Sequence, residues 1–196
     1  MSLKPLFLLC LSAALFFSAV PPKRGKVQIK SEIFRIYYSE ILEQPLTVEY
    51  QVKCTEKKFS RAGMDFYTCD SVYTSDDRDY ENNVWDKGHM APAADFSCDR
   101  NLLWGTFSYL NCALQHERLN RGVWRILEEH ERNLALKNQV SVKIVLHFSR
   151  HSLKLESGAV VPDGFTKTLS YSGMTETYYF PNSEPTKATF RDYLQK

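Results

Sequence analysis

One stretch of the chain, Asp86 to Arg132, constrains the fold more than any other. Its first part indicates a strand that runs into Gly88, where the missing side chain permits close backbone approach, and that ends before Pro92, which has no N–H for a ladder. A second strand is expected at residues 106–111 and a helix at residues 119–132. The stretch therefore predicts strand, loop, strand and helix in succession, with polar side chains near the element ends.

The expected helix carries an apolar stripe and a polar row. At helical spacing one largely apolar face is formed by Leu119, Val123, Ile126, Leu127 and His130. Residues four apart form a second row, because four residues advance only about 40° beyond a full turn, and this row comprises Asn120, Trp124, Glu128 and Arg132. An amide, a carboxylate and a guanidinium therefore line one edge. An ordinary amphipathic helix with a solvated polar face is the alternative interpretation.

Four short motifs follow one another within this stretch. They are DKGH at residues 86–89, LNCALQ at 110–115, LNRGVW at 119–124 and LEEHER at 127–132. In this order they resemble the motifs of the DNA/RNA non-specific endonuclease family, the ββα-metal nucleases of the Serratia and endonuclease G type. A looser likeness extends over roughly residues 35–185. Four motifs in one order are specific, whereas DKGH alone would be a weak signal.

The resemblance implies an α+β fold in a single domain. The family architecture is a central antiparallel β-sheet with a ββα-metal (His-Me finger) active-site unit packed on one side. The 196 residues suffice for one domain with its own core, and residues 33–196 are assigned to it. Further strands are expected at residues 33–38, 140–146, 166–171 and 176–180, with one more that ends at residues 50–52, and a final helix is expected at 188–194.

The resemblance also implies chemical roles. His89 matches the general base, and a neutral imidazole suits this role because its ordinary pKa of about 6.5 lets it accept a proton at neutral pH. Asn120 matches the one direct protein ligand of Mg²⁺, with Mn²⁺ as a substitute, and sparse ligation suits a small cation that loses water reluctantly. Glu128 would orient the water shell of the cation, and Arg132 would hold a phosphate oxygen with its planar fork. Asp86 is expected to be structural.

Other positions are expected to bind substrate. Residues 61–66 are similar to the family segment that supplies a phosphate-binding arginine. Arg61 is therefore the expected phosphate-binding residue, and Lys57 and Lys58 are the alternatives. Lys87 stands where the family commonly has arginine, so it keeps the charge but loses the two-pronged contact.

Asn111 and Gln115 match a polar pair of the family. The pair would touch substrate or orient the start of the helix, and satisfying local backbone groups is the alternative. Leu110 and Leu114 depart from the family pattern, which has serine and often proline at these places.

The resemblance implies a metal-dependent, sugar-nonspecific endonuclease. Such an enzyme cuts DNA and RNA internally and leaves 5′-phosphate ends, with both polymers as substrates and no dedicated protein partner evident. The formal net charge is only +2, so phosphate affinity must come from local cationic clusters rather than from a global basic field. The alternative function is a catalytically weak or inactive nucleic-acid-binding protein on the same fold.

The N-terminus indicates a targeting segment. Residues 1–20 are expected to be a signal peptide, with Lys4 before a mostly apolar run at residues 6–17 and small residues after it. A basic linker at residues 21–32 would follow. The expected location is therefore secreted, and the alternative is a membrane anchor formed by residues 5–20.

Beyond that leader the chain has four cysteines: Cys54, Cys69, Cys98 and Cys112. An even number in a secretory context indicates up to two disulfides, for which three connectivities exist. A pair between Cys98 and Cys112 would tie the expected second strand to the loop before it, and isolated buried thiols are the alternative. A structural zinc site is not favoured, because no two of these cysteines lie two to four residues apart.

Overall fold

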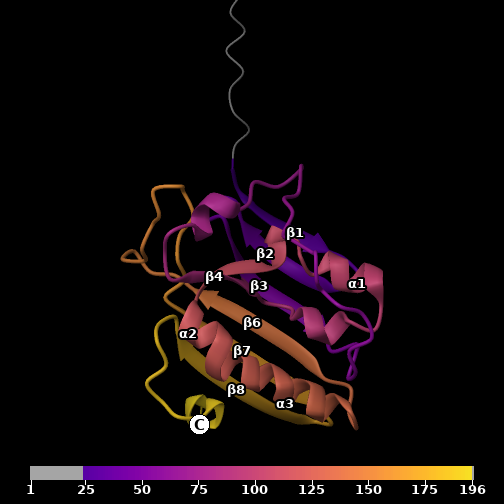
Figure 1. Ribbon diagram of the computed structural model, residues 1–196. Coiled ribbons are helices and arrows are strands. Elements are labelled where there is room, and N and C mark those ends of the chain that lie inside the picture. The colour runs from indigo at the N-terminus through magenta and orange to yellow at the C-terminus, as the bar shows by residue number, and fades with distance from the viewer. Residues whose placement is uncertain (1–23, 196) are drawn as a thin grey trace, which may run out of the picture.

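The computed structural model describes residues 24–195, which form a six-stranded antiparallel sheet in the order β1-β2-β3-β6-β7-β8 (Figure 1). Its strands are β1 Lys26–Lys30, β2 Phe34–Ser39, β3 Gln44–Gln51, β6 Ser141–His147, β7 Gly164–Tyr171 and β8 Met174–Pro181. The expected α+β class, single domain and central antiparallel sheet are confirmed.

Alternating side chains give the sheet one buried face. In β6 the residues Val142, Ile144 and Leu146 are buried, whereas Lys143 between them is exposed. The register places Ile144 beside Val48 of β3 on one side, and beside Lys167 of β7 on the other. Side chains in a strand alternate between the two faces, so the same register directs Lys167 into the apolar layer.

The ββα unit forms a second, two-stranded sheet and the helical segment that follows it. Its strands are β4 Trp85–His89 and β5 Cys112–His116, and its helical parts are α2 Glu117–Leu119, the π-helical turn η4 Asn120–Trp124 and α3 Arg125–Ala135. Figure 1 shows α3 lying in front of β7 and β8, beside β6 and running in nearly the same direction as the strands. The active-site unit therefore lies on one face of the large sheet, as expected.

Two expectations about this unit are wrong in detail. The helix expected to run unbroken over residues 119–132 is interrupted at Gly122, whose φ of −99° and ψ of −120° are not helical. The second strand expected at residues 106–111 lies later, at β5, because Ser108 caps a 3₁₀ turn over Tyr109–Asn111. Both shifts follow from residues with strong local preferences, a glycine and a capping serine.

The chain ends also differ from expectation. Part of the expected basic linker, Lys26–Lys30, is strand β1, which pairs with β2 along its whole length. The expected final helix is only a 3₁₀ turn, η5 Phe190–Tyr193. The expected signal peptide lies outside the described residues, and among residues 24–195 no helix is long and apolar enough to cross a membrane.

Aromatic packing and a buried ion pair hold α3 to the sheet. Trp124 is fully buried, with its ring centroid 5.4 Å from that of Phe165 and 5.6 Å from that of Phe180. Lys167 forms an ion pair with Glu131 at 2.5 Å, and both side chains are fully buried. A large aromatic side chain at such a position typically contributes about 3–5 kcal/mol relative to alanine.

A disulfide joins Cys54 to Cys98. The pairing suggested between Cys98 and Cys112 is therefore wrong, and Cys69 and Cys112 are free thiols. The two cysteines are 44 residues apart in the sequence. Cys54 follows strand β3, and Cys98 follows the 3₁₀ turn η2 Ala93–Phe96, so the bond links these two segments. Closing such a loop stabilises the fold by reducing the freedom of the unfolded chain.

We expect the double substitution Cys54→Ser with Cys98→Ser to lower the free energy of unfolding by about 2–4 kcal/mol, because the unfolded chain regains the freedom of the closed loop. Urea denaturation followed by circular dichroism measures this change. Cys69→Ser is the matched control and should change the free energy by less than about 0.5 kcal/mol. Equal stability of the double variant and the control would contradict the disulfide.

Candidate active site

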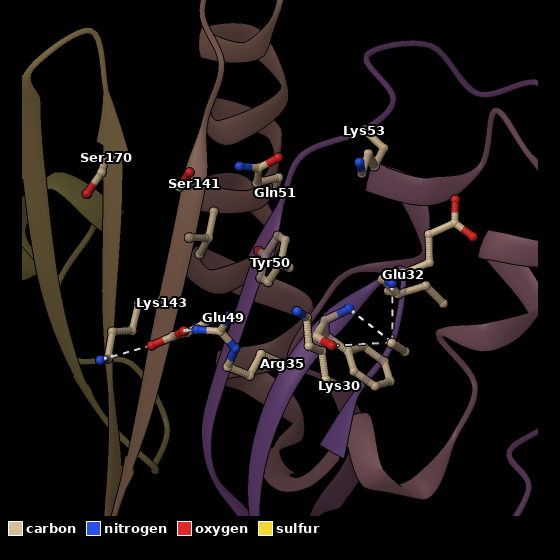
Figure 2. A pocket seen from close by; sticks show the side chains of 14 residues that line it. Lys30, Glu32, Arg35, Glu49, Tyr50, Gln51, Lys53, Ser141, Lys143 and Ser170 are labelled. Carbon is tan, nitrogen blue, oxygen red and sulfur yellow. Dashed lines mark hydrogen bonds and ion pairs between the residues drawn. The ribbon is translucent and has the colours of Figure 1, made fainter. Parts of the chain in front are cut away.

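The surface has two hollows that are candidate sites, and the first is lined by none of the site residues expected from the sequence. Figure 2 shows the hollow on the outer face of the sheet, across β2, β3 and β6. Its central charges neutralise one another, because Glu49 forms ion pairs with Arg35 at 3.5 Å and with Lys143 at 3.0 Å. None of the site residues expected from the sequence lines it.

The second hollow, of about 860 Å³, lies between the ββα unit and the loop at residues 57–66. Six of the eight expected site residues line it: His89, Glu128, Arg132, Asn120, Arg61 and Lys87. These residues come from β4, η4, α3 and the loop, so only the tertiary fold brings them together. This hollow is the candidate active site.

Asn120 is held in one orientation by Asp86. The Nδ2 group of Asn120 donates to Oδ2 of Asp86 at 2.8 Å. The same carboxylate accepts from Nε and Nη2 of Arg121, at 2.9 and 2.5 Å. Since the amide nitrogen is engaged, the amide oxygen is the atom that Asn120 can offer to a cation in the hollow. The expected structural role of Asp86 thus takes the form of orienting the amide.

His89 ends β4 and packs between two phenylalanine rings. Its ring centroid lies 4.7 Å from that of Phe66 and 4.8 Å from that of Phe107, the latter edge-on. Burial, with a smaller effect of the Arg61 charge, lowers the pKa of His89 to about 3. Its Nε2 atom has no hydrogen-bond partner among the described residues. The imidazole is therefore neutral at physiological pH, which is the form that a general base requires, although its apolar surroundings lower its affinity for a proton.

Glu128 is half-buried, lines the hollow and lies one helical turn before Glu131 of the buried ion pair. Burial raises the pKa of Glu128 to about 7, and the positive charges of Lys167 and Arg132 oppose this rise. Lys167 is therefore both an anchor of α3 and a source of positive charge behind the site. The sequence pattern did not reveal this role, because Lys167 lies in a polar run, FTKTLS, that resembles an ordinary amphipathic strand.

Arg132 is held by the carboxylate of Asp95, a residue that no sequence motif indicated. Its Nη1 donates to Oδ1 of Asp95 at 2.8 Å, and Asp95 is fully buried. The backbone oxygen of Asp95 in turn accepts from the N–H groups of Lys53 at 3.1 Å and Cys54 at 2.9 Å. One side of the guanidinium is thus fixed, while the residue still lines the hollow. The signal available in the sequence was an acidic residue within the apolar segment Ala91–Phe96.

The cations around the hollow differ in how far they are neutralised. Lys87 forms ion pairs with Asp77 and, at 3.4 Å, with Asp65. By contrast, Lys57 and Arg61 form no ion pair within residues 24–195. Arg61 and Lys57 are therefore the cations with the most freedom to meet a phosphate.

Asn111 and Gln115 are buried and do not line the hollow. Asn111 donates to the backbone oxygens of Ala91 and Thr106, each at 2.9 Å, and accepts from the N–H of Ala91 at 2.8 Å. These contacts satisfy the backbone just beyond His89, the alternative that the sequence left open for Asn111.

Gln115 packs against Gly88, where the two strands of the ββα unit approach closely. A Cβ atom at Gly88 would lie 2.5 Å from Oε1 and 2.7 Å from Cβ of Gln115. Glycine is therefore required at this position, as expected from its place before His89.

Comparison with known proteins agrees with this geometry. A solved structure titled "Crystal structure of the EndoG/EndoGI complex: Mechanism of EndoG inhibition" matches with a TM-score of 0.78 at 21% identity, covering 86% of this chain and 80% of that chain. Mitochondrial endonuclease G from Homo sapiens is 33% identical over 121 residues, and that from Bos taurus is 33% identical over 78 residues. The mitochondrial nuclease EXOG from Danio rerio is 35% identical over 66 residues.

The alignments with these relatives are partial. They cover 59%, 38% and 34% of this chain, and 41%, 26% and 19% of the relatives, so the chain spans less than half the length of each. The family model for DNA/RNA non-specific endonucleases, however, matches residues 12–194. Because this match spans nearly the whole chain, the chain belongs to the DNA/RNA non-specific endonuclease family.

Proposed function

We propose that the protein is a Mg²⁺-dependent, sugar-nonspecific endonuclease that hydrolyses phosphodiester bonds within DNA and RNA and leaves 5′-phosphate ends. Membership of the nuclease family supports hydrolysis of nucleic acids at the general level. The observation that carries the finer proposal is the neutral His89 imidazole beside Asn120, Glu128 and Arg132 in one hollow.

The donor atoms in the hollow fit a hard divalent cation. Among the described residues, no group of three or more His, Cys, Asp or Glu side chains could hold a metal ion. The amide oxygen of Asn120 would hold Mg²⁺, or Mn²⁺ in its place, as the one direct protein ligand, and the carboxylate of Glu128 would orient water molecules around the cation. Such sparse oxygen ligation suits a cation that retains water. When bound, the cation would supply positive charge that stabilises the phosphate and the departing oxygen.

The residues of the chain would carry the proton and hold the phosphate. His89 takes a proton from a water molecule as the water oxygen forms a bond to phosphorus and the bond from phosphorus to the 3′ oxygen breaks. The 3′ oxygen takes a proton from solvent, so the phosphate remains on the 5′ end of the other fragment. Arg132, tethered by Asp95, and Arg61 would bind the nonbridging oxygens.

The side chains that line the hollow support cleavage of nucleic acids with only a weak preference for base sequence. Its lining contains the cations Lys57, Arg61, Lys87, Arg121, Arg125 and Arg132, against the carboxylates Glu128 and Glu129. Contacts from cations to phosphate position the polymer but carry no sequence information. They also do not distinguish ribose from deoxyribose, which supports action on both polymers.

Binding without efficient cleavage is the second candidate function. It is favoured by the ion pairs of Lys87 with Asp77 and Asp65, which neutralise a cation that would otherwise face the phosphate. Lysine at this position also lacks the planar fork of arginine.

We propose a secreted location, with a membrane anchor through residues 5–20 as the alternative. The disulfide between Cys54 and Cys98 supports an oxidising compartment. The relatives endonuclease G and EXOG are mitochondrial by name, so their location differs from the proposed one.

The proposal predicts that the purified protein digests both plasmid DNA and RNA with Mg²⁺ and digests neither in EDTA. His89→Ala should lower the rate by about 10²–10⁴-fold, because the base is lost. Gel analysis of time courses measures the rates. His151→Ala, which changes an exposed histidine outside the hollow, is the matched control and should retain the wild-type rate. Folded wild-type protein that cleaves neither polymer would refute the nuclease proposal and leave the binding function.

The low pKa of His89 predicts that its ring stays neutral in the metal-free protein. Its Cε1–H resonance should not titrate between about pH 5 and pH 8, whereas an ordinary histidine has a pKa of about 6.5. In the unfolded chain the ring has its ordinary pKa and gains a proton as pH falls below about 6.5, whereas in the folded chain it stays neutral down to about pH 3. His89 therefore lowers the free energy of unfolding progressively as pH falls from about 6.5 to 3. Proton-carbon NMR, with assignment through His89→Ala, checks this, and a midpoint near the ordinary pKa would refute it.

The tether of Arg132 predicts that Asp95→Asn lowers kcat/KM by about 10- to 100-fold, because a charge-assisted hydrogen bond no longer fixes the guanidinium. Steady-state kinetics on a labelled oligonucleotide measures the loss. The matched control is Glu49→Gln, which makes the same chemical change in the ion-paired hollow of Figure 2. Equal kinetic effects of the two variants, with both folded by circular dichroism, would rule out a positioning role for Asp95.

A further inference from the structure

Two aromatic side chains are stacked on each other at the surface. The rings of Tyr67 and Trp104 are nearly parallel, with an interplanar angle of 10° and centroids 5.6 Å apart. Tyr67 is 36% exposed and Trp104 is 47% exposed. Large flat apolar surfaces that remain open to water are characteristic of binding surfaces. We refer to these two residues as the aromatic pair.

The backbone around the aromatic pair is well fixed. The N–H of Tyr67 donates to the backbone oxygen of Phe107, and its own oxygen accepts from the N–H of Tyr109, both at 3.0 Å. Trp104 lies in the helix α1 Arg100–Gly105, which is capped by the side chain of Asp99. The two rings are therefore held before any ligand arrives, which lowers the entropic cost of binding.

The chain neighbours of the aromatic pair form a wall of the candidate active site. Phe66, next to Tyr67, and Phe107, bonded to Tyr67 through the backbone, both contact the ring of His89. Leu103, next to Trp104, also lines the hollow. Tyr67 and Trp104 do not themselves line the hollow, but their backbone is continuous with the wall formed by Phe66, Leu103 and Phe107. The aromatic pair therefore adjoins the hollow through this wall.

A cation accompanies the aromatic pair. Arg100 is exposed and lies four residues before Trp104, so the two side chains share one face of α1. On the loop side of the rim, Arg61 forms no ion pair within residues 24–195. An aromatic platform beside guanidinium groups is the combination that binds the bases and the phosphates of a single strand.

We propose that Tyr67, Trp104 and Arg100 form a subsite that stacks one unpaired base of the substrate strand next to the phosphate that is cleaved. The subsite rests on the proposed nuclease function and names its preferred substrate as single-stranded or locally unpaired nucleic acid. Bases within a duplex are covered on both faces by their neighbours, so they reach the platform only after unstacking. All bases offer a flat face, so the subsite tolerates any sequence.

The test measures affinity without cleavage. In EDTA, the His89→Ala protein is titrated into a fluorescein-labelled oligothymidylate, and separately into a labelled, blunt-ended, GC-rich DNA duplex without loops or overhangs. Fluorescence anisotropy gives a Kd for each. We expect the added substitution Trp104→Ala to lower the ratio of single-strand to duplex affinity by about 5- to 100-fold, the usual effect of losing one stacked base.

Two further variants make this test specific. Trp104→Phe keeps an aromatic face and should restore most of the ratio, which a merely structural role of the indole ring would not require. Tyr37→Ala removes another exposed aromatic ring, 41% exposed on β2 and away from the hollow, and should leave the ratio unchanged.

The outcomes separate the subsite from the nuclease function. If the wild-type protein cleaves nucleic acid but Trp104→Ala leaves the ratio unchanged, or weakens both ligands equally, the subsite is refuted and the nuclease function stands. If the His89→Ala protein binds neither ligand and the wild-type protein cleaves neither polymer, the proposed function is refuted, and the subsite with it. A selective loss that phenylalanine restores supports the subsite.

Discussion

An ion pair between Glu131 and Lys167, both fully buried, joins the helix α3, which lines the candidate active site, to strand β7 of the sheet. Removing two charges from water is costly. The two opposite charges lie 2.5 Å apart, and the hydroxyl of Tyr50 donates to Oε2 of Glu131 at 2.7 Å, whereas Nζ of Lys167 and Oε1 of Glu131 have no hydrogen-bond partner of good geometry among the described residues. Because Glu131 precedes Arg132 directly and follows Glu128 by one turn, anchoring it also fixes the rotation of the helix. Glu128 and Arg132 consequently face the hollow.

The charges around the hollow are arranged so that few of them are free. Asp95 holds Arg132, and acidic side chains neutralise Lys87, which leaves Arg61 and Lys57 unpaired within the described chain. A neutral His89 lies among these cations, since its apolar surroundings disfavour the imidazolium. A local excess of positive charge thus coexists with a formal net charge of only +2 over the whole chain.

The sequence motifs located most of the candidate site, because each motif sits on one element and has a fixed spacing. His89, Asn120, Glu128 and Arg132 lie in one hollow as the resemblance implied. Their detailed surroundings were not predictable from spacing. Asp95 reaches Arg132 from a distant turn, and the loop that carries Phe66 meets His89 only through long-range contacts.

The sequence alone determined the fold class, the family and the order of the active-site motifs, since alternating strands and short motifs are local properties of the chain. The tertiary structure decided which groups meet. It paired Cys54 with Cys98, broke the helix at Gly122 and stacked Tyr67 on Trp104. Contacts of this kind join residues far apart in the chain or depend on the packing around a single backbone position, and no local pattern records them.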